Sequence, residues 1–167
     1  MAEEKKIGAI KEELQAAEDS MLPDFIARYE KDERSGVKTL VEKARKRIQK
    51  LETEYARIEN LKKYEKEYAD AGYICGIDEV GRGPLAGPVV AGAVILPKDC
   101  DILYINDSKK LSAAMREKLY DEIMEKAVAT GIGMAGPGRI DEINILQATY
   151  EAMRQAITNL KVKPDIL

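Results

Sequence analysis

Two apolar runs joined by a short turn constrain the fold of this chain more than any other feature. The first run, YICGIDEV, covers residues 73–80, and the second, PVVAGAVILP, covers residues 88–97. The turn between them, GRGPLAG, consists mostly of Gly and Pro, which favour turns. A parallel connection needs about a dozen residues or more, so the two runs are predicted to pair as antiparallel strands. The second run is apolar throughout, which predicts a strand covered on both faces.

An acidic pair, Asp78 and Glu79, ends the first run. Neighbouring side chains in a strand point to opposite faces, so the two carboxylates can approach one centre only if the backbone leaves the pleat at or just after Glu79. Gly81 and Gly83 permit that departure. Carboxylates held together repel unless a cation lies between them, and oxygen ligands select Mg²⁺ or Mn²⁺. Arg82 adds a positive group suited to phosphate or ribose oxygens. The pattern indicates a metal site beside a phosphate ester; the alternative is a turn cap followed by a solvated glutamate.

The sequence contains no histidine, which narrows the possible chemistry. Ser-His and Cys-His nucleophile systems and His-ligated zinc sites are excluded. Cys75 and Cys100 are interpreted as reduced, structural thiols, because nothing in the sequence argues for export. The turn lacks the Lys and the following helix of a P-loop, and Pro84 and Pro88 lead into a strand, whereas a dinucleotide fingerprint opens a helix. Chemistry is therefore expected to depend on carboxylates, Lys, Tyr or a metal bound by oxygen.

Composition indicates a folded protein of the cytoplasm. Residues are 45% hydrophobic and 34% charged, which is typical of a globular chain. No apolar run approaches the roughly 18 residues of a membrane span, and the acidic N-terminus does not match a secretory signal. No membrane association is therefore expected. The net charge of −3 means that a nucleic-acid partner would have to meet local basic patches.

Residues 1–70 are predicted to form a helical N-terminal extension, and residues 71–167 a second domain. Two shorter helices are followed by one from Ser35 to Asp70, with Ser35 as its N-cap and Gly72 as its stop. Apolar positions in this last helix alternate in steps of four and three, which places them in a seam on one side: 37, 41, 44, 48, 51, 55 and 58.

The extension has two interpretations. It carries 16 Lys and Arg against 17 Asp and Glu, as expected of exposed helices that pack or self-associate through the seam. Alternatively, a dense group of cations lies along the phosphates of a nucleic acid: Lys43, Arg45, Lys46, Arg47 and Lys50.

The residues after the hairpin are predicted to continue as helix, strand and helix. The first helix is expected to run from the N-cap Ser112 to Gly131, and the weak strand lies in TGIGMAGPG. The second helix is expected to begin at Asn144, with Gln147 completing a capping box. KVKPDIL, residues 161–167, is interpreted as the opening of another strand. The face that the second helix buries is predicted to comprise Leu146, Thr149, Tyr150, Met153, Ile157 and Leu160.

Three motifs in order resemble one known family. GIDEVGRGPLAGPVVAGAVILP, then DSKKLS, then IDEINILQATYEAM closely resemble the type 2 ribonucleases H (ribonuclease HII) over residues 73–167. FIARYEKDERSGVKTLVEKARKRI resembles the helical extension of some bacterial members. The resemblance implies an α/β protein with a ribonuclease H-like mixed sheet and flanking helices, incomplete at the C-terminus and preceded by the α-helical extension. Residues 71–167 would then be the N-terminal portion of the catalytic domain.

The resemblance also implies an activity. Members of this family are metal-dependent endonucleases that use Mn²⁺ or Mg²⁺ to cleave the RNA strand of RNA/DNA hybrids and single ribonucleotides embedded in duplex DNA. Two-metal hydrolysis leaves a 5′-phosphate and a 3′-hydroxyl. By resemblance, Asp78 and Glu79 are catalytic metal ligands. Substrate binding falls to the loop that reads the 2′-OH and to two lysines on the nucleic-acid backbone, for which a solvated loop is the alternative: Gly81, Arg82, Gly83, Lys109 and Lys110.

One departure from the family pattern limits what these residues can do. The family uses four acidic residues, and the third and fourth lie on and after the strand that KPDIL begins; Asp165 is too early in that strand to be one of them. The 167-residue chain is therefore expected to be inactive alone. The full-length enzyme is expected to be a monomer. Self-association of its extension remains open as an alternative. A helical adaptor and a non-catalytic nucleic-acid-binding module remain as alternatives.

Overall fold

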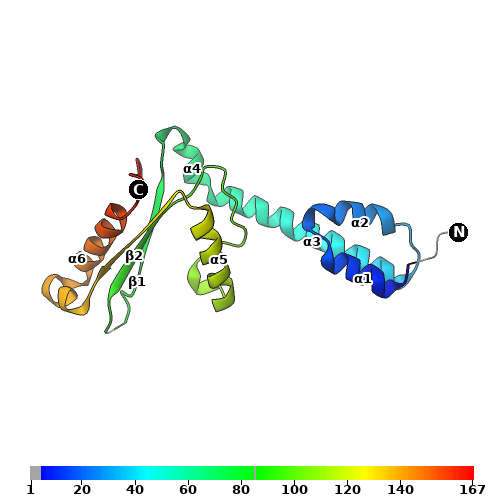
Figure 1. The fold of residues 1–167 in the computed structure, drawn as a ribbon, viewed down its shortest axis with the longest axis horizontal. Helices are drawn as coiled ribbons and strands as arrows, with labels where there is room; N and C mark the ends of the chain where they lie inside the picture. Colours follow the sequence, from blue (N-terminus) through cyan, green and yellow to red (C-terminus); the bar gives the residue numbers. More distant parts are fainter. Residues whose placement is uncertain (1–4, 85) are drawn as a thin grey trace. The chain divides into compact units, whose positions relative to one another are not determined.

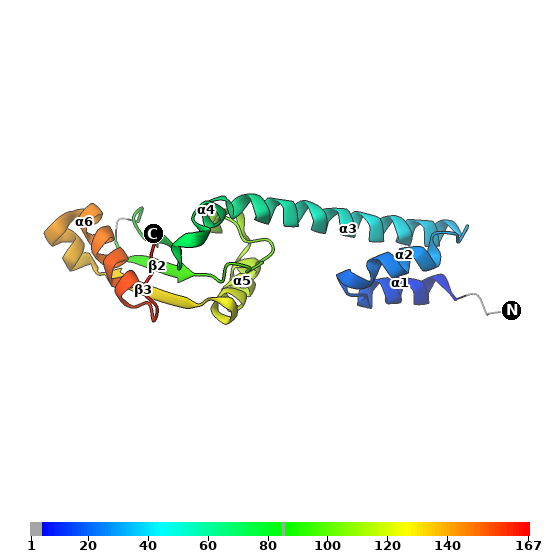
Figure 2. The same cartoon turned by 90° about the horizontal axis from the view of Figure 1, so that it is seen from above.

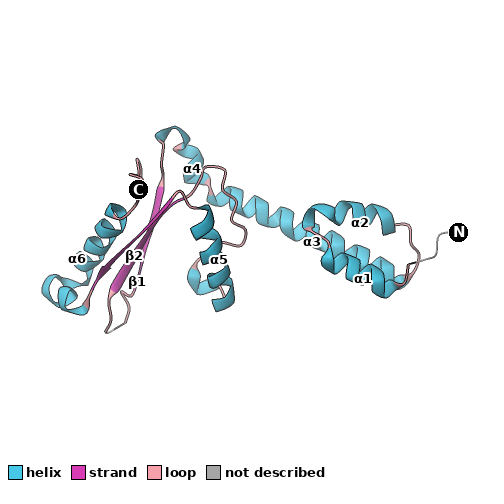
Figure 3. Ribbon diagram, viewed as in Figure 1, coloured by secondary structure: helices cyan, strands magenta, loops and turns pink. Residues whose placement is uncertain are grey.

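The chain divides into two compact units. The computed structural model describes residues 5–84 and 86–167, and the units are Met1–Asn60 and Leu61–Leu167. Figure 1 labels the helices and strands, and Figure 3 distinguishes the two kinds of element by colour. Each unit has its own buried apolar cluster, the first among helices and the second between a sheet and a helix. The predicted site residues all belong to the second unit.

The first unit buries helix against helix. Its elements are α1 (Ile7–Ala16), a 3-10 turn (Asp19–Met21), α2 (Leu22–Tyr29) and α3 (Ser35–Leu61). Two rings of α2 pack with their centroids 4.9 Å apart, those of Phe25 and Tyr29. The buried cluster comprises Ile10, Leu14, Leu22, Phe25, Tyr29, Val37, Leu40, Val41 and Ala44.

The predicted seam on α3 is therefore partly used inside the unit. Val37, Val41 and Ala44 belong to the buried cluster, so no partner chain is needed to cover them. Tyr55, later in the seam, is 47% exposed. The helix begins one residue earlier than predicted, because the Arg34 carbonyl, rather than that of Ser35, accepts the first backbone hydrogen bonds.

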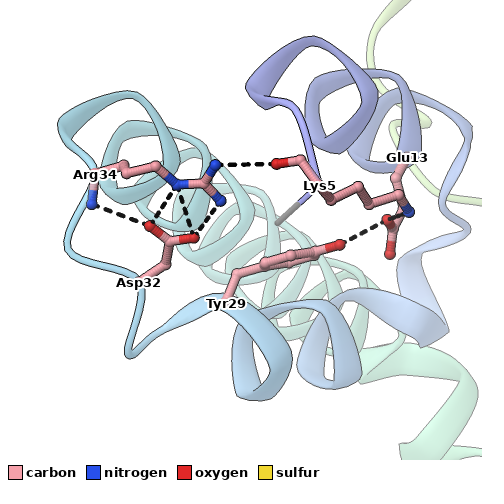
Figure 4. Close-up of polar contacts among 5 residues, drawn as sticks. All are labelled: Lys5, Glu13, Tyr29, Asp32 and Arg34. Atoms are coloured by element: carbon pink, nitrogen blue, oxygen red, sulfur yellow. Dashed lines mark hydrogen bonds and ion pairs between the residues drawn. The ribbon is translucent and has the colours of Figure 1, made fainter. Parts of the chain in front are cut away.

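Polar contacts hold the first unit together beside its apolar cluster (Figure 4). Glu13 accepts hydrogen bonds from the Lys5 ammonium and from the Tyr29 hydroxyl, the latter at 2.9 Å. The Lys5 contact is the main reason why the pKa of Glu13 lies below its ordinary value. Arg34 Nε donates to Asp32 Oδ1 at 2.9 Å and lowers the pKa of that carboxyl.

The end of α3 differs from the prediction. The helix stops at Leu61 rather than at Asp70, because Lys62 leaves helical dihedrals with φ −76° and ψ 16°. A short helix, α4 (Lys63–Glu67), and a 3-10 turn (Ala69–Ala71) fill the remaining residues. Gly72, predicted to stop the long helix, instead follows this 3-10 turn, with φ +86°.

The second unit is built on a three-stranded antiparallel sheet. Its strands are β1 (Cys75–Val80), β2 (Val89–Ile95) and β3 (Ala129–Ala135), in the order β1-β2-β3. The predicted hairpin is confirmed, with Val80 opposite Val90. The prediction that both faces of β2 are covered is wrong: alternate residues from Val89 to Ile95 are buried, whereas Gly92 on the other face is exposed. One face of the sheet is thus packed and the other is open.

Helix α6 (Pro137–Thr158) covers the packed face, alongside β2 and β3 (Figure 2). Its buried stripe is made of small residues, Ala148, Ala152 and Ala156, together with Thr149. These allow a close approach: a Cβ on Gly133 of β3 would lie 2.0 Å from the Ala152 carbonyl oxygen. The predicted face is wrong in part, because Leu146 and Tyr150 are 43% and 47% exposed.

The outer edge of β3 is occupied by side chains of α6. Gln155 Oε1 accepts the Met134 backbone N–H at 3.1 Å, and Asn159 Nδ2 donates to the Ile132 carbonyl at 2.8 Å. Such contacts satisfy backbone groups that an edge strand otherwise leaves open. Gly131, predicted to end the preceding helix, lies in this strand; α5 (Ala113–Lys126) ends earlier.

Helix α6 consists of two helical segments that meet at Asn144. This residue has φ +67° and ψ 162°, a conformation that non-glycine residues rarely adopt. Its Oδ1 accepts the backbone N–H groups of Leu146 and Gln147 at 3.0 and 3.1 Å. Asn144 therefore caps the second segment as predicted, but a further helical segment precedes it.

The opposite edge of the sheet begins a parallel pairing. Ile74 and Ile166 form a parallel bridge, and the Cys75 N–H donates to the Ile166 carbonyl at 3.0 Å. Asp165 Oδ2 accepts the Tyr73 N–H at 2.8 Å. The C-terminal residues thus add a single parallel bridge beside β1 to an otherwise antiparallel sheet, and the structure has the predicted α/β class with flanking helices.

Candidate metal and nucleic-acid site

The acidic pair lies in regular strand geometry near the end of β1. Asp78 is opposite Gly92 and Glu79 is opposite Ala91, so Asp78 belongs to the open face of the sheet and Glu79 to the face that α6 covers. The pleat continues through Val80 and the backbone leaves it at Gly81, just after the acidic pair, so Asp78 and Glu79 themselves stay in regular strand geometry. Asp78 Oδ1 accepts the Glu79 N–H at 2.8 Å.

The turn after β1 brings a cation to this pair. Gly81 has φ +96°, and a Cβ there would lie 2.3 Å from the Pro88 carbonyl oxygen, so only glycine fits. Gly83 has no such restriction. Arg82 Nη1 lies 3.4 Å from Glu79 Oε1, with 45% of the arginine side chain exposed. A guanidinium is thus held beside a carboxylate and remains accessible to an anionic ligand.

The carboxylates suit a divalent cation in kind, but not in number. Both offer hard oxygen donors, which Mg²⁺ and Mn²⁺ prefer. Within residues 5–84 and 86–167, no group of three or more Asp, Glu, Cys or His side chains is arranged so that it could hold a metal ion. Asp78 and Glu79 are the carboxylates predicted to hold a cation, but the regular pleat directs their side chains to opposite faces of the sheet, so the structure does not bring the two to one centre.

Lys109 and Lys110 lie on a short 3-10 turn (Ser108–Lys110) that precedes α5, and both are exposed. Asp107 Oδ1 accepts the Lys109 N–H at 2.9 Å. Among the residues that the structure describes, no hydrogen bond or ion pair joins either lysine to Asp78, Glu79 or Arg82. The structure thus brings Arg82 to Glu79 but, among the residues it describes, gives no contact of the lysines with the acidic pair.

The sequence does not single out Arg116, which holds this turn. Its Nη1 donates to the carbonyls of Ser108 and Leu111 at 3.2 and 2.8 Å. The position of Arg116 could have indicated this contact. A cation near the start of a helix is disfavoured by the helix dipole, so it is expected to find a partner elsewhere.

The two cysteines have no place in this site. Cys75 and Cys100 are free thiols, and burial raises the pKa of both, which favours the protonated form. In the part of the chain that the structure describes, no helix has the length and apolar content needed to cross a bilayer.

Two family profiles match this chain, one over most of each unit. The profile of the ribonuclease HII N-terminal domain matches residues 6–69, and the ribonuclease HII profile matches residues 75–167. Ribonuclease HII of Lachnoclostridium phytofermentans is 60% identical over 162 residues, covering 97% of this chain and 64% of the relative. Ribonuclease HII of Enterococcus faecalis is 50% identical over 169 residues, covering 100% and 66%. The chain thus spans about two thirds of the length of these curated relatives.

One solved structure is also similar. The crystal structure of ribonuclease H2 from Pyrococcus horikoshii aligns with a TM-score of 0.47 and 28% identity, covering 55% of this chain and 46% of that one. The sheet, the flanking helices and the acidic strand end define an α/β protein of the ribonuclease H type. Within that class, the chain belongs to the ribonuclease HII family.

Proposed function

We propose that the protein containing this chain is a metal-dependent endonuclease that cleaves the RNA strand of RNA/DNA hybrids and single ribonucleotides embedded in duplex DNA. The observation that carries the proposal is the contact between Arg82 and Glu79 at 3.4 Å across the Gly81 turn. It joins an acidic strand end to an exposed guanidinium, a combination suited to binding a phosphodiester, in a chain of the ribonuclease HII family.

Each residue of the site has a role in this proposal. Asp78 and Glu79 would be the residues that hold Mn²⁺ or Mg²⁺, and the bound ion would supply activation of water and stabilisation of negative charge. Arg82 binds the sugar-phosphate, and the backbone of Gly81 and Gly83 approaches the 2′-OH that distinguishes RNA from DNA. Lys109 and Lys110 bind backbone phosphates. Hydrolysis then leaves a 5′-phosphate and a 3′-hydroxyl.

Residues 1–167 alone are expected to bind this substrate without cleaving it. At the strand end the described residues supply two carboxylates, those of Asp78 and Glu79. A two-metal site needs more ligands than these two side chains offer. We further propose that the whole protein acts as a monomer in the cytoplasm, where nucleic acid of this kind occurs.

A chimera tests the activity. The chain is fused to the part of the Lachnoclostridium phytofermentans relative that it does not span, and cleavage of a duplex with one embedded ribonucleotide is measured in Mn²⁺ and in Mg²⁺. The chimera is expected to cut at the ribonucleotide, and Asp78→Asn to abolish cutting while binding persists. Binding without any cutting by the folded chimera would instead favour the non-catalytic module. Cleavage by residues 1–167 alone would contradict the two-carboxylate reasoning.

Exposed lysines on the helical extension favour nucleic-acid contact. The arginines of the cationic group are already paired, because Arg45 and Arg47 form ion pairs with Glu42 and Asp19 at 2.8 and 2.5 Å. Three exposed lysines on the side of α3 away from the buried cluster have no ion pair among the described residues: Lys43, Lys46 and Lys50. We expect their joint replacement by Ala to weaken hybrid binding and reduce its salt dependence. Unchanged binding, with association of the chain that depends on concentration, would favour the adaptor.

A further inference from the structure

The turn that carries Lys109 and Lys110 is held by contacts on both of its sides. On the N-terminal side, Asp107 Oδ1 accepts the Lys109 N–H at 2.9 Å, and the Asp107 carbonyl accepts the Lys110 N–H at 2.9 Å. On the C-terminal side, Arg116 Nη1 donates to the carbonyls of Ser108 and Leu111 at 3.2 and 2.8 Å. The backbone around both lysines is therefore fixed by side chains that lie outside the lysine pair.

Arg116 occupies a position that makes this contact specific. It lies near the start of α5, where the positive end of the helix dipole disfavours a cation. The start of that helix is itself fixed, because Ser112 Oγ accepts the Met115 N–H at 3.3 Å. The guanidinium therefore reaches back from a fixed helix to two carbonyls of the turn, and its charge strengthens both hydrogen bonds.

A fixed backbone matters for lysines that bind phosphate. Lys109 and Lys110 are exposed, and within the described ranges no carboxylate forms an ion pair with either of them. A flexible turn would lose conformational freedom when the two ammonium groups meet phosphates, whereas a turn already ordered avoids that cost. The affinity of the lysine pair therefore depends on what orders the turn.

We propose that Arg116 is a positioning residue that orders the turn of residues 107–112, so that Lys109 and Lys110 meet the sugar-phosphate backbone as a preorganised pair. The inference depends on the proposed binding role of the two lysines. A direct contact of Arg116 with phosphate is the competing explanation, and it makes different predictions for combined variants.

Fluorescence anisotropy with a labelled RNA/DNA hybrid tests the proposal, using residues 1–167 in the presence of a metal chelator. Arg116→Ala is expected to weaken binding about three- to tenfold, the effect of ordering one or two side chains. Arg116→Lys is expected to recover part of the loss, because an ammonium donates to carbonyls without the planar fork. Lys118→Ala is the matched control: it removes one exposed charge from the same helix and should change affinity less than about twofold.

The combined variant separates positioning from direct contact. In a chain that already carries Lys109→Ala and Lys110→Ala, Arg116→Ala should cost less than about twofold more, since coupled residues are not additive. Backbone amides of Lys109 to Leu111 should also exchange hydrogen faster in Arg116→Ala, with an unchanged urea midpoint for the chain.

Three results would overturn the proposal, and they are distinguishable. Full affinity in Arg116→Ala would show that the turn needs no such support. Full additivity with unchanged amide exchange would assign Arg116 a direct phosphate contact. Full affinity in the double lysine variant would remove the proposed role of the lysines and the inference with it, while leaving the acidic site and Arg82 untouched.

Discussion

The packing of α6 on β3 predicts a large effect of one added methyl group. In Gly133→Ala, the new Cβ would lie 2.0 Å from the Ala152 carbonyl oxygen and 2.6 Å from the Ala156 nitrogen. Both are backbone atoms of a helix, so neither can rotate away. Since a carbon–oxygen contact of the van der Waals kind needs roughly 3.3 Å, the helix has to retreat from the sheet by about 1 Å.

The cost follows from what this retreat disturbs. Overpacking of a tight interface costs about 1–3 kcal/mol. The movement also stretches the hydrogen bonds of Gln155 to Met134 and of Asn159 to Ile132, which span 3.1 and 2.8 Å. Each contributes about 0.5–1.5 kcal/mol, and partial exposure favours the lower end. We therefore expect a loss of about 3 kcal/mol in the free energy of unfolding of the second unit.

Urea unfolding followed by circular dichroism, with hydrogen exchange of residues 129–135 as a local readout, measures this loss. With a urea dependence of about 2 kcal/mol per M, the midpoint should fall by about 1.5 M. Gly92→Ala in β2 is the matched control, because a Cβ there has nothing within 4 Å, and its change should stay within about 0.5 kcal/mol. Equal midpoints for the two variants would refute the close approach of α6 to β3.

Three further outcomes can be checked on the same chain. Asn144→Ala should cost about 1 kcal/mol in thermal unfolding because it removes the cap, whereas Asn144→Gly, which suits φ +67°, should be almost neutral; equal losses would contradict the strain. The folded-state pKa of Glu13 lies below its ordinary 4.5, so the stability from its contacts is complete above that pH and is lost as the pH falls toward the lowered pKa. An acid titration by circular dichroism should show a shallower loss for Glu13→Gln. Alkylation should leave Cys75, 2% exposed with a raised pKa, unmodified until urea unfolds the sheet, while Cys100 reacts first; simultaneous modification would contradict the burial.

Local signals explain which parts of the fold could be predicted from the sequence. The hairpin of β1 and β2, the Ser112 cap and the Asn144 cap each depend on residues close together in the chain, and all are present. The Asp78–Glu79 strand end and the Arg82 turn were located for the same reason, although the assignment of metal and substrate roles to them stays a prediction.

Non-local packing explains the errors. The buried face of α6 was misassigned because large side chains normally mark a core, whereas here Ala152 packs where Gly133 leaves room on another element. The end of α3 at Leu61 has no Gly or Pro to mark it. The regular pairing of β1 with β2 as far as Val80 and Val90 keeps Asp78 and Glu79 on opposite faces of the sheet. That pairing joins two separate strands.

The side-chain amides on the outer edge of β3 leave the sheet with one blocked edge and one edge that can pair. Gln155 and Asn159 occupy donors and acceptors that an incoming strand would need, so that edge resists pairing with another chain. The β1 edge instead already accepts Ile166 in parallel register. Because that bridge is parallel, a strand paired along this edge would run in the direction from Ile74 toward Asp78. Of the two sheet edges, the one that carries Asp78 and Glu79 is thus the edge left for backbone pairing.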